Sequence, residues 1–446
     1  MSGSGRTTLR RAIGLPHATA MVIGTIVGAS IFVQPSEITG QVPTITGVFA
    51  VWVISGLLTF IGALVCAELA STFSESGGVY VYLREAYSPA TGFLWGWAMF
   101  WSMHSGIIAA IAVVFARYTA YFLPLGDYGV KAVAIVAILL LSGINYIGVR
   151  SGSLLQTFFT LIKLLAIVLI IGFGFALGSR LPEHYAVEEM MARPFTFSDF
   201  LTALVAGLFA YGGWHMVTYS SEETVNPRRT IPTALLLGTV IVTLCYVAMN
   251  AVYLYVLPLS TVASSTRVAA DAADVLIGFG GGATMSAIVM FSTFGALSGI
   301  ILAGPRVYYS MARDGLLFRW FAEVHPTFRT PHRAILLQGV WSCVLVATGT
   351  FRVLFTRVIY TEWVFFGLMA IGLLLLRRRP DMRRSYSVWG YPVLPAAFIV
   401  SSFVIVLNQI MSNTAESMFG LSFVLIGLPV YHLWARSRYV RRQGPL

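Results

Sequence analysis

Two hydrophobic segments that lie far apart in the chain are each interrupted by small residues at mid-length. Residues 24–30 read GTIVGAS within the segment 17–35, and residues 209–214 read FAYGGW within the segment 197–221. Glycine weakens a membrane helix, and unwound backbone at membrane depth is tolerated only where it faces protein or a water-filled cavity. A matched pair of interruptions, one in each half of the chain, is typical of the midplane substrate site of a secondary transporter.

The expected breaks can bind both ends of a zwitterion through the backbone alone. Where the first helix unwinds, the next half-helix begins with unpaired N–H groups and the positive end of its dipole, which suit a carboxylate. The preceding half-helices end in carbonyl groups without partners, around Ile26 and Phe209, which suit an ammonium group. A zwitterionic amino acid therefore fits between the breaks. The alternative is that the small residues only allow close helix packing.

Lys163 is the second candidate for chemistry, because it lies well inside the fifth hydrophobic segment, ~16 Å from its start. An ionisable residue inside a membrane segment is expensive and is by default a candidate for a functional site. The alternative is a lysine that reaches the membrane interface with its ammonium group, and the depth of Lys163 argues against it.

The composition indicates the elements that must position these residues. The chain of 446 residues is 57% hydrophobic and only 11% charged, and its mean hydropathy is +0.80, so we expect a protein embedded in lipid. Runs long enough to cross roughly 30 Å of hydrocarbon recur along the whole chain. The fold class is therefore an all-α polytopic membrane protein with about twelve spans, near residues 17–35, 45–70, 89–122, 130–148, 153–178, 198–220, 231–257, 283–311, 334–350, 357–376, 392–411 and 417–435.

The basic residues indicate how these segments are oriented. If the amino terminus is cytoplasmic, the inner loops and tails hold most of the 29 Lys and Arg residues, as the positive-inside rule requires. We expect a multi-pass protein of the cell membrane, plasma or inner, with both termini cytoplasmic. This topology explains the net charge of +11 without a nucleic-acid partner. The arginines within 377–384 could also hold anionic lipid headgroups.

The positions of the two breaks predict the domain organisation. Aligning Gly28 with Gly212 gives an offset close to the length of five spans, which suits two five-helix halves of opposite membrane orientation. We expect the first repeat over 9–180, the second over 197–379, and two further helices over 390–436. The first segment lacks a small-residue cleavage site, so we expect a retained helix rather than a signal peptide. No inner loop is long enough for a fused soluble domain of ordinary size.

The remaining polar residues inside the segments are weaker signals. Glu68 and Arg306 could pair as an inner gate or as a static ion pair. His104 and His215 could line a pocket, although structural, hydrogen-bonded histidines are the better interpretation. The three cysteines, Cys66, Cys245 and Cys343, fall inside predicted spans. Packing is therefore favoured over redox or metal chemistry for them. We expect no cofactor, no metal and no disulfide-linked heavy subunit.

Two other classes of function are disfavoured. A membrane-embedded enzyme needs clustered carboxylates, a metal set or a Ser-Lys pair, and Lys163 has no second convergent group that we can identify in the sequence. A channel would need a selectivity-filter-like repeat, which the sequence lacks.

Several strings, in consistent order from about residue 9 to 410, carry a family resemblance. The first break resembles the first-helix signature of the amino acid–polyamine–organocation (APC) superfamily, and the second is similar to the sixth-helix motif of its L-type amino acid transporter branch. The further matches are EETVNPRRTIP at 222–232, MARDG at 311–315, HP at 325–326, RTP at 329–331 and WGYP at 389–392.

The resemblance implies a five-plus-five inverted-repeat fold, the LeuT-like fold, in which broken helices 1 and 6 hold the substrate. It implies that the N–H groups of Ala29 and Ser30 bind the α-carboxylate and that carbonyl groups of both breaks bind the α-ammonium. The ring of Phe209 would be a gate toward the outside. The implied substrate-binding residues are Ile26, Gly28, Ala29, Ser30, Phe209, Ala210, Gly212 and Trp214.

Two departures from the family pattern affect the expected substrate. Ser30 replaces the usual third glycine of the small triplet, and His215 replaces a frequent asparagine of the sixth helix. Both leave the backbone contacts possible, but they change the size and polarity of the space for the substrate side chain.

In the branch that this chain resembles, a lysine at the position of Lys163 sits where sodium-coupled relatives hold a sodium ion. Lys163 would bond carbonyl groups near Gly24 and a hydroxyl such as Ser298, bracing the first helix against the eighth. A tethered ammonium group fills a cation site permanently, which makes sodium coupling unnecessary. The same group could also exchange a proton, so proton-linked transport stays open.

These considerations predict a sodium-independent transporter of neutral amino acids that works by alternating access. It would operate either as an exchanger or as a proton-linked transporter. The alternative is a cationic amino acid or polyamine transporter of the same fold, which should need acidic residues facing the pocket. We identified only Glu68 and Asp199 as acidic residues near it, and both lie close to helix ends, so neutral substrates are favoured.

Overall fold

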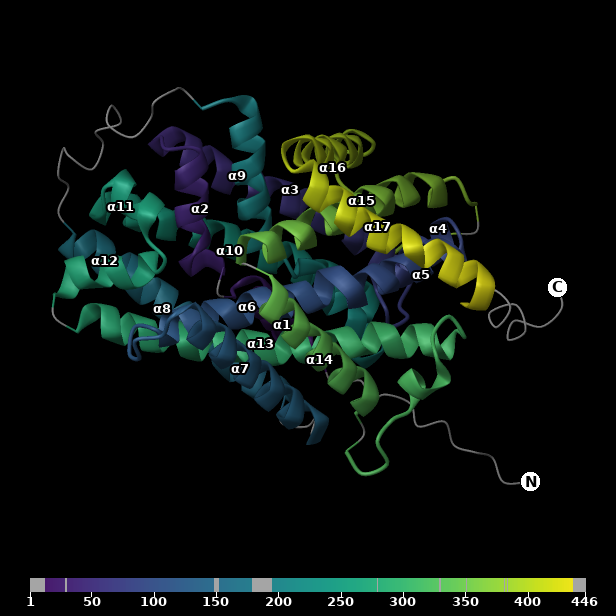
Figure 1. Cartoon of the computed structure of the whole chain (residues 1–446). Coiled ribbons are helices and arrows are strands. Elements are labelled where there is room, and N and C mark those ends of the chain that lie inside the picture. Colours follow the sequence, from purple (N-terminus) through teal and green to yellow (C-terminus); the bar gives the residue numbers. More distant parts are fainter. Residues whose placement is uncertain are drawn as a thin grey trace.

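A computed structural model describes residues 13–28, 30–147, 152–178, 195–278, 280–328, 330–349, 351–380, 382 and 384–435. The described chain is almost entirely helical, and its only β contact is an isolated bridge between Ile13 and Thr224. Figure 1 shows long helices running roughly parallel through one bundle. The helices are α1 (Leu15–Ile26), α2 (Gln34–Gln41), α3 (Ile45–Thr72), α4 (Val79–Ala86), α5 (Pro89–Ala98), α6 (His104–Thr119), α7 (Asp127–Ile147), α8 (Gly152–Leu177), α9 (Phe197–Ala210), α10 (Pro227–Val256), α11 (Leu259–Ser264), α12 (Val268–Ile277), α13 (Gly281–Arg313), α14 (His332–Thr348), α15 (Phe351–Leu376), α16 (Val393–Ser412) and α17 (Thr414–Val430).

The predicted membrane segments are present as helices. Among the described residues, nine helices are long and apolar enough to cross a membrane, and three shorter apolar helices, Leu15–Ile26, His332–Thr348 and Gly420–Leu433, accompany them. Each of the twelve predicted segments overlaps one of these helices. The predicted all-α polytopic class is confirmed. The division into two inverted repeats stays a prediction.

Local sequence signals explain where several of these helices begin. Thr44 caps α3 by accepting a hydrogen bond from the N–H of Gly47, and Ser88 caps α5 in the same way. Thr196 and Asp199 form a reciprocal capping box at the start of α9. Asp199 therefore has a structural role at a helix end.

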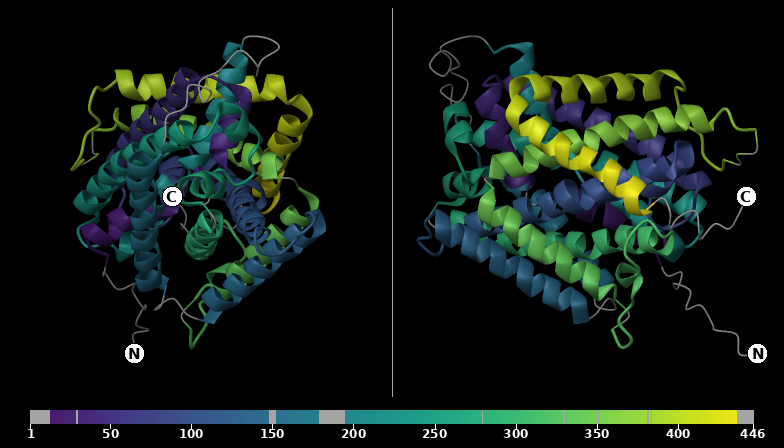
Figure 2. Two further views of the ribbon diagram at one scale, coloured as in Figure 1. Left: turned by 90° about the vertical axis from the view of Figure 1, so that its left-hand side faces the viewer. Right: turned by 45° about the vertical axis from the view of Figure 1, so that its right-hand side comes forward.

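The helices differ in how much of their surface the bundle covers. Most residues of α9 and of the continuous α5–α6 segment are buried, whereas only about a third of the residues in the apolar windows of α7, α8 and α16 are buried. Exposed apolar helix surface of this extent suits contact with lipid. In Figures 1 and 2, α16 and α17 lie along one side of the bundle, and α7 and α14 lie together along the opposite side.

The two ends of the bundle differ in their short helices. Figure 1 shows α2, α11 and α12 together at one end, which we call the α2 end, and α4 at the other, which we call the α4 end. The beginning of α1 belongs to the α4 end, because Ile13 exchanges backbone hydrogen bonds with Glu223 and Val225 beyond the sixth apolar segment. The helices around α1 are α8 and α10, which both pack against it.

Candidate functional site

The first predicted break is present between α1 and α2. Helix α1 ends at Ile26, and the backbone then turns away, with φ −70° and ψ 80° at Val27. The N–H of Gly28 folds back onto the carbonyl of Ile26 at 2.7 Å. A short 3-10 helix, Ser30–Phe32, follows, so the N–H of Ser30 has no acceptor within that helix. Ala29 lies outside the described residues.

The second predicted break follows α9. This helix ends at Ala210, and a 3-10 helix, Trp214–Glu223, begins after Gly213. The φ of Gly213 is +94°, a conformation that residues with a side chain rarely adopt. A Cβ atom on Gly213 would also lie 3.0 Å from the carbonyl oxygen of Thr25, so the backbones of the two breaks approach each other closely here.

Polar contacts join the two breaks. The hydroxyl of Thr25 donates to the carbonyl of Gly213 at 3.2 Å. The hydroxyl of Tyr246, on α10, lies 2.9 Å from the carbonyl oxygen of Ile26 and 3.2 Å from that of Ala210. Tyr246 therefore bridges the carboxyl ends of α1 and α9 with one hydroxyl group, a role that the sequence did not predict.

A cavity lies between the two breaks, with an empty volume of about 360 Å³. That figure includes space open to solvent; the part that the centre of a water molecule can occupy is about 20 Å³, which is room for about one water molecule, so the cavity must widen to accept a substrate. Five of the predicted substrate-binding residues line it, namely Ile26, Gly28, Ser30, Phe209 and Gly212. The rest of the lining comes from Thr25 and Gly213 at the breaks, Met216 after the second break, Ile107 and Ile111 on α6, Ile300 on α13, and Val358, Ile359 and Glu362 on α15.

Two predicted substrate-binding residues are placed elsewhere. Ala210 does not line the cavity, and its carbonyl already accepts the Tyr246 hydroxyl. Trp214 also lies outside the cavity lining, and its ring packs against Phe366 with 5.0 Å between the ring centroids. The side chain of Trp214 is 2% exposed, so it is part of the packed core beside the break.

Lys163 is buried on α8, with 2% of its surface exposed. Its ammonium group donates to the carbonyl of Val27 at 3.1 Å and to the carbonyl of Gly24 at 3.4 Å. The last four carbonyl groups of a helix have no intrahelical partner, and a cation near them is favourable. Lys163 thus binds the carboxyl end of α1 from outside the cavity lining. The alternative of a lysine reaching the membrane interface does not apply.

Ser298, the predicted hydroxyl partner of Lys163, has another partner. The side-chain amide of Asn145, on α7, donates to the hydroxyl of Ser298 at 3.2 Å and to its carbonyl at 3.4 Å. The hydrogen bonds of Lys163 to described residues involve only the two α1 carbonyls.

Glu362 is the ionisable residue of this cavity that the sequence interpretation missed. It lies on α15, lines the cavity and is 3% exposed. We identified only Glu68 and Asp199 as acidic residues near the pocket; neither lines this cavity. The rule that drew attention to Lys163, a charged residue deep inside an apolar segment, applies equally to Glu362 within 357–376 and would have found it.

The two histidines are packed among other side chains. The Nε2 atom of His104 lies 2.8 Å from the carbonyl oxygen of Ile300, which fits the expected structural histidine. His215 is 1% exposed and contacts the rings of Trp95 and Phe366. Neither histidine lines the cavity.

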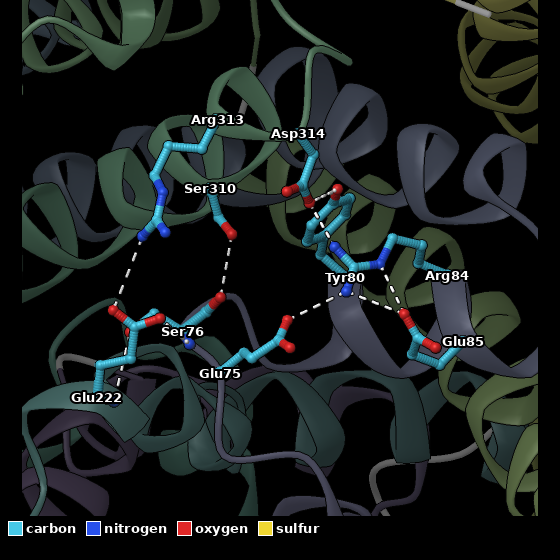
Figure 3. Close-up of polar contacts among 9 residues, drawn as sticks. All are labelled: Glu75, Ser76, Tyr80, Arg84, Glu85, Glu222, Ser310, Arg313 and Asp314. Carbon is cyan, nitrogen blue, oxygen red and sulfur yellow. Dashed lines mark hydrogen bonds and ion pairs between the residues drawn. The ribbon is translucent and has the colours of Figure 1, made fainter. Parts of the chain in front are cut away.

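Ion pairs hold several segments together at the α4 end, as Figure 3 shows. The guanidinium group of Arg84, on α4, pairs with Asp314 after α13 and with Glu75 and Glu85. The Tyr80 hydroxyl donates to the same Asp314 carboxylate at 2.5 Å. Burial, together with this neighbouring carboxylate, raises the pKa of the Tyr80 phenol well above its usual value, so the hydroxyl keeps the proton that it donates.

The same close-up shows a second set of contacts beside the first. Arg313 lies 3.8 Å from a carboxylate oxygen of Glu222, and the Ser310 hydroxyl donates to the carbonyl of Ser76 at 3.0 Å. These contacts join the end of α13 to the loop before α4 and to the end of the second break's 3-10 helix. The α4 end of the bundle is therefore closed by polar contacts between segments far apart in the sequence.

The predicted pairing of Glu68 with Arg306 is wrong. Glu68 is fully buried on α3 and accepts hydrogen bonds from Arg377, just after α15, and from the N–H of Val388. Arg306 instead pairs with Glu223 at 3.2 Å. A sequence does not indicate which of many arginines at one membrane face a buried carboxylate will meet.

The comparisons with known proteins agree with this arrangement. Residues 13–429 match the model of the amino acid permease family. The chain is 33% identical over 430 residues to the serine/threonine exchanger SteT of Bacillus subtilis (strain 168), with 95% of this chain and 97% of the relative covered.

Two human relatives are similar over comparable lengths. The b(0,+)-type amino acid transporter 1 is 30% identical over 439 residues, covering 97% of this chain and 90% of the relative. The large neutral amino acids transporter small subunit 2 is 30% identical over 447 residues, covering 97% and 82%. With a family match over nearly its whole length, the chain belongs to the amino acid permease family of the APC superfamily and is a multi-pass membrane transporter of amino acids rather than an enzyme.

Proposed function

We propose that the protein carries amino acids by alternating access, without sodium, and that the substrate zwitterion binds in the cavity between the two helix breaks. One observation carries the proposal: backbone from both breaks, at Gly28 and Gly212, lines the same cavity. A site built from unpaired backbone groups is the arrangement that secondary transporters with discontinuous helices use for charged substrate groups.

The α-carboxylate is assigned to the N–H groups at the start of the 3-10 helix Ser30–Phe32, with Ala29 as the second donor. The α-ammonium is assigned to the carbonyl group of Gly212, together with that of Phe209, which already accepts the N–H groups of Tyr211 and Gly212 and takes part only if one of these bonds opens. The third implied carbonyl, of Ile26, already accepts the Gly28 N–H and the Tyr246 hydroxyl. A carbonyl oxygen has two lone pairs, so Ile26 takes part only if one of these bonds opens.

Sodium independence is assigned to Lys163. Its ammonium group occupies the carboxyl end of α1 by bonding two carbonyl oxygens there, which are the type of ligand that a sodium ion would otherwise need. A cation that is tethered to the chain cannot follow an ion gradient, so the expected modes are exchange or proton-linked transport.

A second candidate function is cationic amino acid or polyamine transport, because of Glu362. The preference for neutral substrates rested on the absence of an acidic side chain from the pocket, and Glu362 lines that pocket. The acidic residues near the pocket therefore no longer favour neutral substrates over cationic ones.

We infer a cell-membrane protein whose α4 end is cytoplasmic, with helices α1 to α8 and α9 to α15 as inverted repeats. Basic residues at the α4 end, such as Arg84, Arg313 and Arg377, suit the cytoplasmic side. One relative's name includes "small subunit". For this chain we propose no disulfide-linked partner, because its cysteines lie in α3, α10 and α14.

Counterflow in proteoliposomes tests the proposed function. Vesicles containing the purified protein are loaded with one unlabelled amino acid at a time, and uptake of the labelled form is followed in sodium and in choline buffer. We expect saturable, accelerated uptake that is equal in both buffers. Uptake that needs sodium, or the lack of any exchange across the twenty amino acids, would contradict the proposal.

A further inference from the structure

The part of the cavity wall outside the two breaks is apolar with one exception. It consists of Ile107 and Ile111 on α6, Met216 after the second break, Ile300 on α13, and Val358 and Ile359 on α15, together with the carboxyl group of Glu362. If the breaks hold the α-carboxylate and the α-ammonium, this wall faces the substrate side chain. Glu362 is then the polar group that the side chain meets.

The carboxyl group of Glu362 has no partner within the described part of the chain. It forms no hydrogen bond and no ion pair there, although only 3% of the residue is exposed. The other fully buried glutamate, Glu68, contrasts with it, because Glu68 is held by Arg377, Arg384 and a backbone N–H. Buried polar groups are normally hydrogen-bonded, and each exception requires an explanation.

The cavity lining offers no cation that could balance Glu362. The other polar side chains in the lining are Thr25, whose hydroxyl bonds backbone carbonyls, and Ser30. Lys163 lies outside the lining, and its ammonium group is engaged with α1. A carboxylate that faces a narrow cavity rather than bulk water is stabilised by a counter-charge and hydrogen-bond donors. In this cavity, a ligand is the group that can bring them.

We propose that Glu362 is the specificity-determining residue of the site and that it binds the positively charged end of a substrate side chain, as in lysine or ornithine. This assignment rests on the proposed function and adds the substrate class. The α-groups lie at the breaks, the methylene groups of the side chain lie along the isoleucines of α6, α13 and α15, and the terminal ammonium group meets Glu362. The apolar stem of the substrate side chain thus faces an apolar wall, and its charged end faces a carboxyl group.

Lysine and norleucine make a matched pair of probes, since norleucine has the same stem and lacks the terminal amine. Equilibrium binding of each labelled amino acid is measured with the full-length protein in detergent at pH 7. The variants are Glu362→Gln, which keeps the shape of the side chain, and the control Glu323→Gln, in a loop where Glu323 pairs with Arg333. Elution volume and thermal midpoint establish that each variant is folded.

We expect the wild type to bind lysine more tightly than norleucine. Glu362→Gln should weaken lysine binding on the order of tenfold to a hundredfold and leave norleucine binding unchanged, and Glu323→Gln should change neither. Unchanged lysine binding in Glu362→Gln would overturn the assignment. An equal loss of both ligands would overturn it too, because Glu362 would then act on the α-groups.

Two further outcomes separate this inference from the function on which it rests. If neither probe binds but counterflow with another amino acid is found, the substrate class is wrong and the proposed function stands. If no amino acid is exchanged at all, both fail. If an inward proton gradient drives norleucine uptake in the wild type but not in Glu362→Gln, and lysine is not preferred, the carboxyl group handles a proton and the assignment is overturned.

Discussion

Replacing Lys163 by methionine should abolish most transport while the protein still folds. Methionine keeps an unbranched apolar stem and removes the ammonium group that binds Val27 at 3.1 Å and Gly24 at 3.4 Å. A hydrogen bond to a charged group contributes about 1.5–3 kcal/mol, and the longer contact lies at the lower end of that range. We therefore expect a loss of about 3 kcal/mol in the stability of the conformation that holds α1 against α8.

A difference of about 3 kcal/mol corresponds to a shift of roughly 100-fold in a conformational equilibrium. In counterflow, the initial rate per folded protein should fall by a factor on the order of 10 to 100. Lys131→Met is the matched control, because Lys131 also donates to a backbone carbonyl, of Ala347 at 2.8 Å, but at a partly exposed position. Its effect should be below about twofold, as for other surface ion and hydrogen-bond contacts.

Transport by Lys163→Met at the wild-type rate, with unchanged ion dependence, would refute this role of Lys163. The role is also refuted if Lys131→Met is as damaging, since the loss would then come from removing any lysine contact. Thermal midpoints recorded with and without substrate separate a folding defect from a transport defect: a folded carrier that cannot cycle should still be stabilised by substrate.

Three further substitutions test other contacts of the same structure. Gly24→Ala places a Cβ against the Thr160 hydroxyl, closer than van der Waals contact, and should lower the counterflow rate several-fold by separating α1 from α8. The control Gly40→Ala, whose Cβ meets nothing within 4 Å, should be neutral. Glu68→Gln leaves its arginine partners without a buried counter-charge and should reduce stability by about 3 kcal/mol, visible as a drop in thermal midpoint; an unchanged midpoint would refute this. Tyr246→Phe should lower the free energy of unfolding by no more than about 1 kcal/mol yet slow counterflow. Exchange at the wild-type rate in this variant would show that the Tyr246 hydroxyl is dispensable.

The amino-acid sequence was sufficient for the helices and for the two breaks. Length and composition determine which segments can cross a membrane, and each predicted segment overlaps an apolar helix. The breaks follow from local sequence, because Gly28 and Gly213 lie where α1 and α9 must end. Five of the predicted substrate-binding residues line the cavity for the same reason.

The partners of polar side chains were much harder to predict. Glu68 meets an arginine that is 309 residues away in the sequence, and Tyr246 reaches carbonyls of two different segments. These contacts depend on how the helices are arranged around one another, which local patterns do not contain. Glu362 is a different case: its position inside an apolar segment was visible in the sequence, but its orientation toward the cavity was not.

The shared hydroxyl of Tyr246 has a mechanical consequence. One phenolic proton serves two acceptors, on Ile26 and Ala210, so a displacement of either half-helix alone takes one carbonyl oxygen out of reach of this hydroxyl and loses that hydrogen bond, at a penalty of about 0.5–1.5 kcal/mol. Rearrangements in which both half-helices travel together with α10 avoid that penalty. Through Tyr246, helix α10 thus couples the movements of the two helix breaks. It disfavours intermediates in which only one break has shifted.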